Sequence, residues 1–172
     1  MSAATELLLD AYSRVREAVH RAGEGLSADD LAARLDPDAN SIGWLLWHLT
    51  RVQDDHVADV AGREELWTAE GWDARFDLPV SGIGYGHSSE EVGAVRGFGP
   101  ELVLAYYDAV HAQTLEFLRG LRDEDLERVV DESWDPPVTL GVRLVSVVDD
   151  CLEHAGQAAF VRGVLERTRA AG

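Results

Sequence analysis

Asp150 and His154 carry the side chains whose spacing first suggests chemistry. Residues four apart lie one turn above each other on a helix, so the carboxylate and the imidazole point from the same face. Apolar residues follow that face on both sides of the pair, namely Leu144, Val147, Ala158 and Val161. This pattern predicts that the pair faces the protein interior, where one metal ion could contact both side chains. An isolated pair of this kind is commonly only a hydrogen bond or an ion pair, and that interpretation stays open.

His48 is a second polar residue in an apolar stretch, flanked by Trp44, Leu45 and Leu49. A buried neutral imidazole needs a hydrogen-bonding or metal partner. Two histidines and one carboxylate from two facing helices leave open coordination positions on Zn²⁺, Ni²⁺, Fe²⁺ or Mn²⁺. We therefore predict a metal site, catalytic in form, whose ligands are His48, Asp150 and His154.

Asp55 and His56 follow His48 on the same predicted helix and are candidate catalytic residues. Asp55 is better aligned with His48 in angle but lies more than ~10 Å further along the helix axis. His56 lies about 80° round the helix from His48, given 3.6 residues per turn. Neither is expected to bind the same metal. Asp55 is expected to be a supporting or structural partner, and for His56 a role in the pocket is the alternative to a structural one.

His87 and Gln157 are the other candidate catalytic residues. His87 can approach the metal if its loop folds inward, and Gln157 lies close to one turn beyond His154, where it can orient a ligand or a bound water. The Gly-x-Gly-x-Gly run before His87 lacks the strand and the Lys-Ser/Thr of a phosphate-binding loop, so its glycines are expected to serve turns.

Other residues that often carry function have simpler expectations. Cys151 points about 100° away from Asp150 on a helix and is expected to be buried and inert. His20 and His111 are expected to be packing or surface residues. Four tryptophans are expected to lie in the core or to anchor loops, namely Trp47, Trp67, Trp72 and Trp134.

Helical periodicity dominates the chain and must position these side chains. Apolar residues recur at steps of three and four in the segments 6–20, 42–61, 100–118 and 139–167. This predicts an all-α fold, a four-helix bundle of one domain over residues 1–172, with at least one long crossover connection. Asn40 or Ser41 is expected to cap the second long helix, and a short helix is expected at 27–35. Residues 62–99 form the crossover, with a short helix after Ser88 and a role in a pocket wall.

Charge and composition limit the classes of partner. The net charge is −17, with 32 acidic residues against 15 arginines, so nucleic acid and anionic membranes are not expected as partners. No apolar segment has the length needed to cross a bilayer, the N-terminus has no signal-peptide features, and the single cysteine cannot form an internal disulfide. We expect a cytoplasmic protein.

Four motifs together resemble the DinB/YfiT-like superfamily over nearly the whole chain. They are Ser41-Ile-Gly-Trp-Leu-Leu-Trp-His48-Leu, Val-Gln-Asp-Asp-His56, Gly-Tyr-Gly-His87 and Asp150-Cys-Leu-Glu-His154-Ala-Gly-Gln157. The resemblance implies a four-helix bundle in which a histidine on the second helix and an H-x-x-x-H pair on the last bind a divalent metal. His48 and His154 match this pattern. Asp150 departs from it and resembles the branch of mycothiol-dependent maleylpyruvate isomerase, which has a carboxylate there, although Asp is shorter than the Glu of that enzyme.

The same resemblance implies a function. It suggests a metal-dependent transferase or isomerase that joins a low-molecular-weight thiol such as mycothiol to a small-molecule substrate, with Zn²⁺ or Ni²⁺ as the favoured metal and a homodimer as the assembly. No residue of the chain need then be the nucleophile. Two alternatives stay open. One is a metal-dependent hydrolase of a small ester or amide, with Asp55, His56 or Glu153 as base. The other is a non-catalytic, stress-associated binding bundle whose polar triad is structural.

Overall fold

Four long helices make up the body of the protein, and the all-α expectation is confirmed. The computed structural model describes residues 2–170. The long helices are α1 (Ala3–Gly23), α3 (Ile42–Ala61), α7 (Pro100–Arg119) and α8 (Leu140–Ala170). Each gives fully buried side chains to a common core, for example Tyr12, Leu46, Tyr106 and Leu144. No helix of the described residues is long and apolar enough to cross a membrane.

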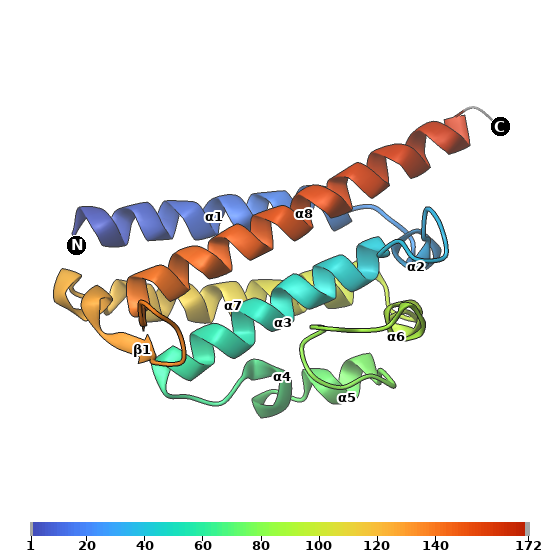
Figure 1. The fold of residues 1–172 in the computed structure, drawn as a ribbon. Coiled ribbons are helices and arrows are strands. Elements are labelled where there is room, and N and C mark those ends of the chain that lie inside the picture. Colours follow the sequence, from blue (N-terminus) through green and yellow to red (C-terminus); the bar gives the residue numbers. More distant parts are fainter. Residues whose placement is uncertain (1, 171–172) are drawn as a thin grey trace.

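The long helices pack in a ring in which α8 and α7 each contact both α1 and α3. Helices α1 and α8 run in one direction and α3 and α7 in the other (Figure 1). The parallel course of α3 and α7 requires the chain to return along the bundle between them, which is the predicted long crossover. As a result α8, which carries Asp150 and His154, lies antiparallel to α3, which carries His48.

Helix α3 begins and ends where its sequence predicts. The Ser41 hydroxyl accepts a hydrogen bond from the backbone N–H of Trp44, and Gly62 closes the helix in the left-handed conformation at φ 69°. All residues from Ile42 to Asp54 are buried, because other elements cover the helix on every side. A histidine in this segment therefore meets protein on all sides.

The crossover contains three short helices, α4 (Leu66–Ala69), α5 (Trp72–Phe76) and α6 (Ser89–Ala94). Only α6 was expected, because helices of four or five residues have no readable periodicity. Asp54 holds the start of α4 against α3, since its carboxylate accepts the backbone N–H groups of Leu66 and Trp67 at 2.9 and 2.8 Å. The short helix before α3 is α2 (Ala28–Ala32), capped by Ser27 and shorter than predicted.

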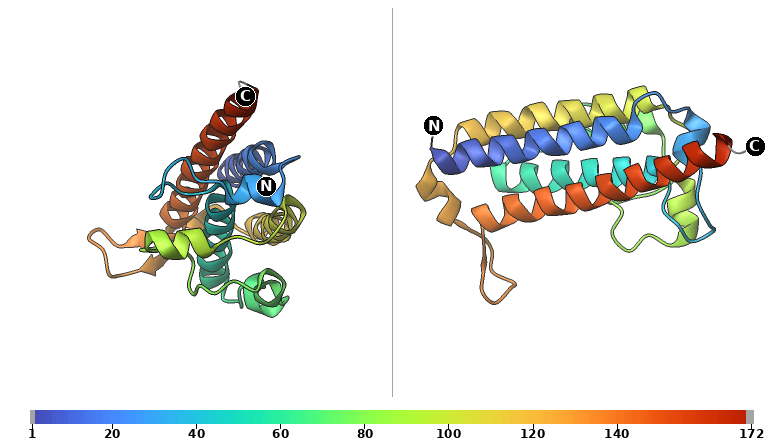
Figure 2. Two further views of the ribbon diagram at one scale, coloured as in Figure 1. Left: turned by 90° about the vertical axis from the view of Figure 1, so that its right-hand side faces the viewer. Right: turned by 90° about the horizontal axis from the view of Figure 1, so that it is seen from above.

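A small hairpin connects α7 to α8. After the 3-10 helix η1 (Asp123–Glu127), strand β1 (Val129–Asp131) pairs antiparallel with β2 (Val138–Thr139). The segment between the strands projects from the bundle (Figure 2). Trp134 lies in it with 67% of its surface exposed, so the expectation that this tryptophan packs in the core or anchors a loop is wrong. The projecting hairpin leaves the indole with no core to enter.

Candidate metal centre

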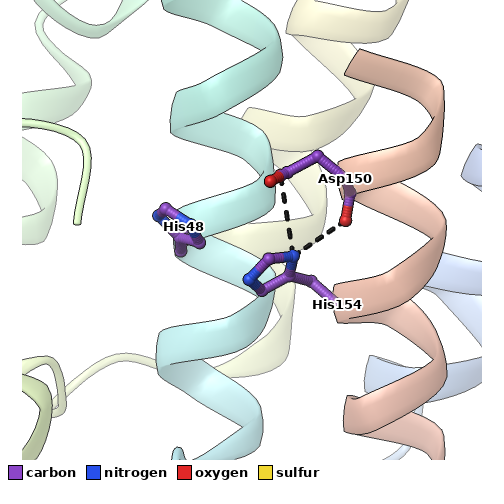
Figure 3. Close-up of side chains that lie close together, drawn as sticks. All are labelled: His48, Asp150 and His154. Atoms are coloured by element: carbon purple, nitrogen blue, oxygen red, sulfur yellow. Dashed lines mark hydrogen bonds and ion pairs between the residues drawn. The ribbon is translucent and has the colours of Figure 1, made fainter. Parts of the chain in front are cut away.

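The structure brings His48, Asp150 and His154 together where α3 and α8 face each other. One nitrogen of each histidine and one oxygen of the carboxylate lie within 4.8 Å of one another. The two imidazole rings are 4.8 Å apart between centroids and inclined at 65°. Figure 3 shows His154 and Asp150 reaching from α8 toward His48 on α3. The three groups, called the triad below, form a candidate metal site of two histidines and one aspartate.

His48 is held in one orientation by its surroundings. Its Nδ1 is hydrogen-bonded to the backbone carbonyl of Ile83, and the indole of Trp44 stacks on its ring at 4.6 Å between centroids. A carbonyl only accepts, so Nδ1 carries the hydrogen and Nε2 keeps its lone pair. Burial lowers the pKa of His48, so the imidazole is neutral at pH 7. Fixing one ring nitrogen in this way is how proteins commonly prepare the other for a metal.

Gly84 lets the crossover approach His48 this closely. Its φ of 107° is in a region that L side chains rarely adopt, and a Cβ at this position would overlap His48 Nδ1. The glycine run therefore does more than make turns. Sequence reasoning missed both Gly84 and the Ile83 carbonyl, although the density of glycines before His87 was the signal that could have found them.

The pair on α8 is arranged in a complementary way. His154 Nδ1 donates to the backbone carbonyl of Asp150 at 2.8 Å, so in the neutral form of this ring the lone pair is on Nε2. The carboxylate oxygen Oδ2 of Asp150 lies 3.6 Å from the same Nδ1 and is buried without a hydrogen-bond partner. A buried carboxylate oxygen without a partner is unfavourable. Two imidazole nitrogens with lone pairs and this oxygen form a donor set that fits a divalent cation.

His56 and Asp55 lie outside the triad. The Arg143 guanidinium donates to His56 Nδ1 at 3.2 Å and to Asp131 on β1 at the same distance. Asp55 Oδ2 lies 3.5 Å from His56 Nδ1. Because a guanidinium only donates, the His56 lone pair is engaged and its Nε2 carries the hydrogen. His56 lies in the wall of a cleft beside the triad, and its chemical role stays a prediction.

His87 also lies outside the triad. Its loop does fold inward, but the imidazole rests on two tryptophans, where it accepts the Trp44 indole N–H at 3.2 Å and stacks on Trp47 at 5.8 Å. Cys151 is buried as predicted, with its Sγ 3.5 Å from the carbonyl of Leu49, and burial raises the pKa of its thiol well above the usual range. A thiol in this state is a poor nucleophile.

Two hollows flank the triad along the line where α3 and α8 meet. The first, the hairpin cleft, has a volume of about 510 Å³ and is lined by Val52, His56, Tyr85, Asp131, Trp134, Val138, Arg143, Ser146, Val147, Asp149, Asp150 and Glu153. The second, the apolar hollow, has about 450 Å³ and is lined by Ala39, Asn40, Leu45, Gly156, Gln157, Phe160 and Val161. Gln157 is exposed there and is not part of the triad.

A family model described as mycothiol S-transferase matches residues 7–167. The chain is also similar to a protein of known crystal structure, described as the conserved protein of a locus from Enterococcus faecalis. The two share 30% identity with a TM-score of 0.87, over 94% of this chain and 96% of that one. No curated protein matches the sequence.

Proposed function

Because the chain belongs to the mycothiol S-transferase family, we propose that it joins the sulfur of mycothiol to a small electrophile, with a divalent metal held by His48, Asp150 and His154. The family also confirms the resemblance to the DinB/YfiT-like superfamily. The observation that carries the metal assignment is the buried, partnerless oxygen of Asp150 beside two imidazoles whose Nδ1 atoms are already bonded to carbonyls.

Each group at the site has its own role in the proposed reaction. A bound divalent metal supplies a Lewis acid, which lowers the pKa of a thiol so that it reacts as a thiolate. The carbonyls of Ile83 and Asp150 orient the two imidazoles, and the Asp150 carboxylate brings the only negative charge of the triad. With one carboxylate in place of a third imidazole, the site is one positive charge lower, and its bound thiol or water is less strongly acidified. Zn²⁺ and Ni²⁺ both suit this donor set.

The proposed transfer is a nucleophilic substitution at the electrophilic carbon. A bond forms between the thiol sulfur and the electrophilic carbon, the bond from that carbon to its leaving group breaks, and the thiol proton goes to a base at the open cleft. The carboxylates of Asp149 and Glu153 line that cleft and can accept the proton. Cys151, buried with a raised pKa, takes no part as a nucleophile.

Hydrolysis of an ester or amide has less support from the geometry. Of the bases considered for it, Asp55 lies outside the cleft lining, and the His56 lone pair accepts from Arg143. Glu153 remains the base within the cleft. The same metal site could still polarise a carbonyl, so the products of the reaction distinguish the two functions.

The test is a conjugation assay with the purified full chain. Protein loaded with Zn²⁺ or Ni²⁺ is mixed with mycothiol and monochlorobimane, and formation of the fluorescent thioether is followed. We expect turnover that requires the metal and is abolished by a chelator. Metal-loaded protein that forms no thioether above the uncatalysed rate with this or a panel of other electrophiles would contradict the proposal. Ester cleavage with solvent oxygen in the product would replace it by hydrolysis.

A further inference from the structure

The hairpin cleft contains two large aromatic side chains that are exposed. Trp134 is 67% exposed and Tyr85 is 61% exposed. Both line the cleft, and they come from the β1–β2 hairpin and from the crossover, two segments far apart in the sequence. Exposed aromatic faces that meet in a concave site are typical of ligand recognition, because they offer flat apolar surface at small entropic loss.

The cleft opens directly onto the triad. Asp150 belongs to both, and the ring of Tyr85 meets that of His48 edge-on at 5.3 Å between centroids. A thiol whose sulfur lies at the triad can therefore extend the rest of its molecule into the cleft without crossing the bundle.

Arg143 fixes the shape of the cleft. Its guanidinium binds Asp131 of β1 and His56 of α3, each at 3.2 Å, while Arg143 itself is on α8. One side chain thus ties the hairpin to both helices that carry the triad. The arrangement fixes the base of the hairpin loop that carries Trp134 before a ligand binds, which lowers the entropy lost on binding.

The charges of the cleft disfavour an anionic ligand, and its carboxylates can accept hydrogen bonds from a ligand rich in hydroxyl groups. Its lining has the carboxylates of Asp131, Asp149, Asp150 and Glu153 and the guanidinium of Arg143. Even if Asp150 is neutralised by a metal, three carboxylates oppose one guanidinium. Carboxylates accept hydrogen bonds from hydroxyl groups but repel anions. A sugar offers many hydroxyl donors and a C–H face that packs on an indole ring.

We propose that the hairpin cleft binds the polyhydroxylated, uncharged part of the thiol substrate, with Trp134 as its packing surface and the carboxylates as acceptors for its hydroxyl groups. This inference rests on the proposed function, since mycothiol carries its cysteine on a sugar joined to inositol. It adds a reason for selectivity: thiols whose remaining groups are carboxylates or phosphates meet repulsion in this cleft.

The probe that tests the inference is S-methyl mycothiol, which keeps the sugar and inositol but has no thiol to ionise. Its binding to the full chain is measured by calorimetry. We expect Trp134→Ala to weaken binding roughly tenfold, because it removes the aromatic packing surface, and Trp134→Phe to restore most of the affinity. Phe160→Ala, which removes a comparably exposed aromatic from the apolar hollow, should leave binding unchanged. Trp134 is exposed, so these variants should fold, and circular dichroism verifies it.

The outcomes separate this inference from the proposed function. In the conjugation assay, Trp134→Ala should raise KM for mycothiol and leave kcat unchanged, because Trp134 does not touch the reacting atoms. If the wild-type protein binds S-methyl mycothiol through Trp134 but conjugates nothing, the transferase proposal fails and the cleft assignment stands. Three results would overturn the cleft assignment. The wild-type protein could conjugate mycothiol without binding the probe, the probe could bind Trp134→Ala as tightly as wild type, or Phe160→Ala could weaken probe binding as much as Trp134→Ala does.

Discussion

The hairpin cleft and the apolar hollow lie on the same two helices, at opposite ends of the same triad, and yet they differ in chemistry. On α3 the order is Leu45 in the hollow, His48 in the triad and His56 in the cleft, and α8 passes the same three regions in reverse. The cleft lining holds four carboxylates and a guanidinium, while the lining of the hollow has no ionisable side chain. The α3–α8 pair thus carries the proposed metal ligands, whereas the segments packed around that pair determine which groups line the space beside them.

The segments that pack beside α3 and α8 explain why the two linings differ in charge. At the cleft the β1–β2 hairpin and Tyr85 add aromatic and charged groups that solvent still reaches. At the hollow the segment before α3 contributes only Ala39 and Asn40. Groups in the cleft can therefore discriminate by charge and hydrogen bonding, and groups in the hollow only by shape and apolar contact.

The largest expected effect is the difference between removing a histidine of the triad and removing a histidine of the cleft wall. His48→Ala should remove a metal ligand, so the purified protein should lose its bound metal and conjugate mycothiol at least ~100-fold more slowly. His56→Ala changes the same residue type on the same helix, outside the triad, and should keep the metal. Elemental analysis of both variants checks the prediction. Equal metal loss in the two variants would show that the triad and the cleft wall are not distinct.

The second-largest effect is expected from disturbing the contact between Gly84 of the crossover and His48. Gly84→Ala should lower metal affinity about 10- to 100-fold, because the added Cβ displaces the His48 ring or breaks its bond to Ile83. Gly86→Ala is the matched control: its φ of 72° is also positive, but no atom lies within 4 Å of an added Cβ. It should cost about 1 kcal/mol of stability and leave metal affinity unchanged. Metal titration with a competing chelator measures both, and a similar loss of affinity in Gly86→Ala would argue against the contact.

A smaller effect tests the charge of the cleft. Asp149→Asn combined with Glu153→Gln should narrow the preference for mycothiol over an anionic thiol such as glutathione by roughly 2- to 30-fold, since each of the two exposed charges contributes about 0.2–1 kcal/mol. The change should shrink at high salt. Glu116→Gln, an exposed acidic residue on α7 far from both hollows, is the control. The ratio of kcat/KM for the two thiols is the measurement, and a ratio equal in all three proteins would contradict the charge argument.

The smallest effect concerns Cys151. Replacement by Ala should leave kcat for conjugation unchanged, because the buried thiol is not the nucleophile, and should lower the free energy of unfolding by about 1 kcal/mol through the small cavity it leaves. The activity assay and urea unfolding check the two parts. Loss of turnover in a folded Cys151→Ala protein would show that the cysteine takes part in the reaction.

Much of the fold followed from local rules that need no tertiary structure. The periodicity of α3 and α7 predicted their bounds to within a residue, and Ser41 and Gly62 act through hydrogen bonds and backbone angles within a few residues. The short helices α4 and α5 were missed because they are too short to show a period. They are held by distant partners, as Asp54 holds α4.

The same division holds at the site. The sequence alone determined that Asp150 and His154 share one face of a helix, because the helical repeat places residues four apart together whatever surrounds them. It also identified His48 as a polar residue that needs a partner. The packing of distant segments brings Ile83 and Gly84 against that histidine, rests His87 on tryptophans instead of in the triad, and leaves Trp134 exposed at a cleft. These contacts join segments 35 or more residues apart, whose meeting depends on how the crossover and the hairpin pack, and no local spacing encodes that.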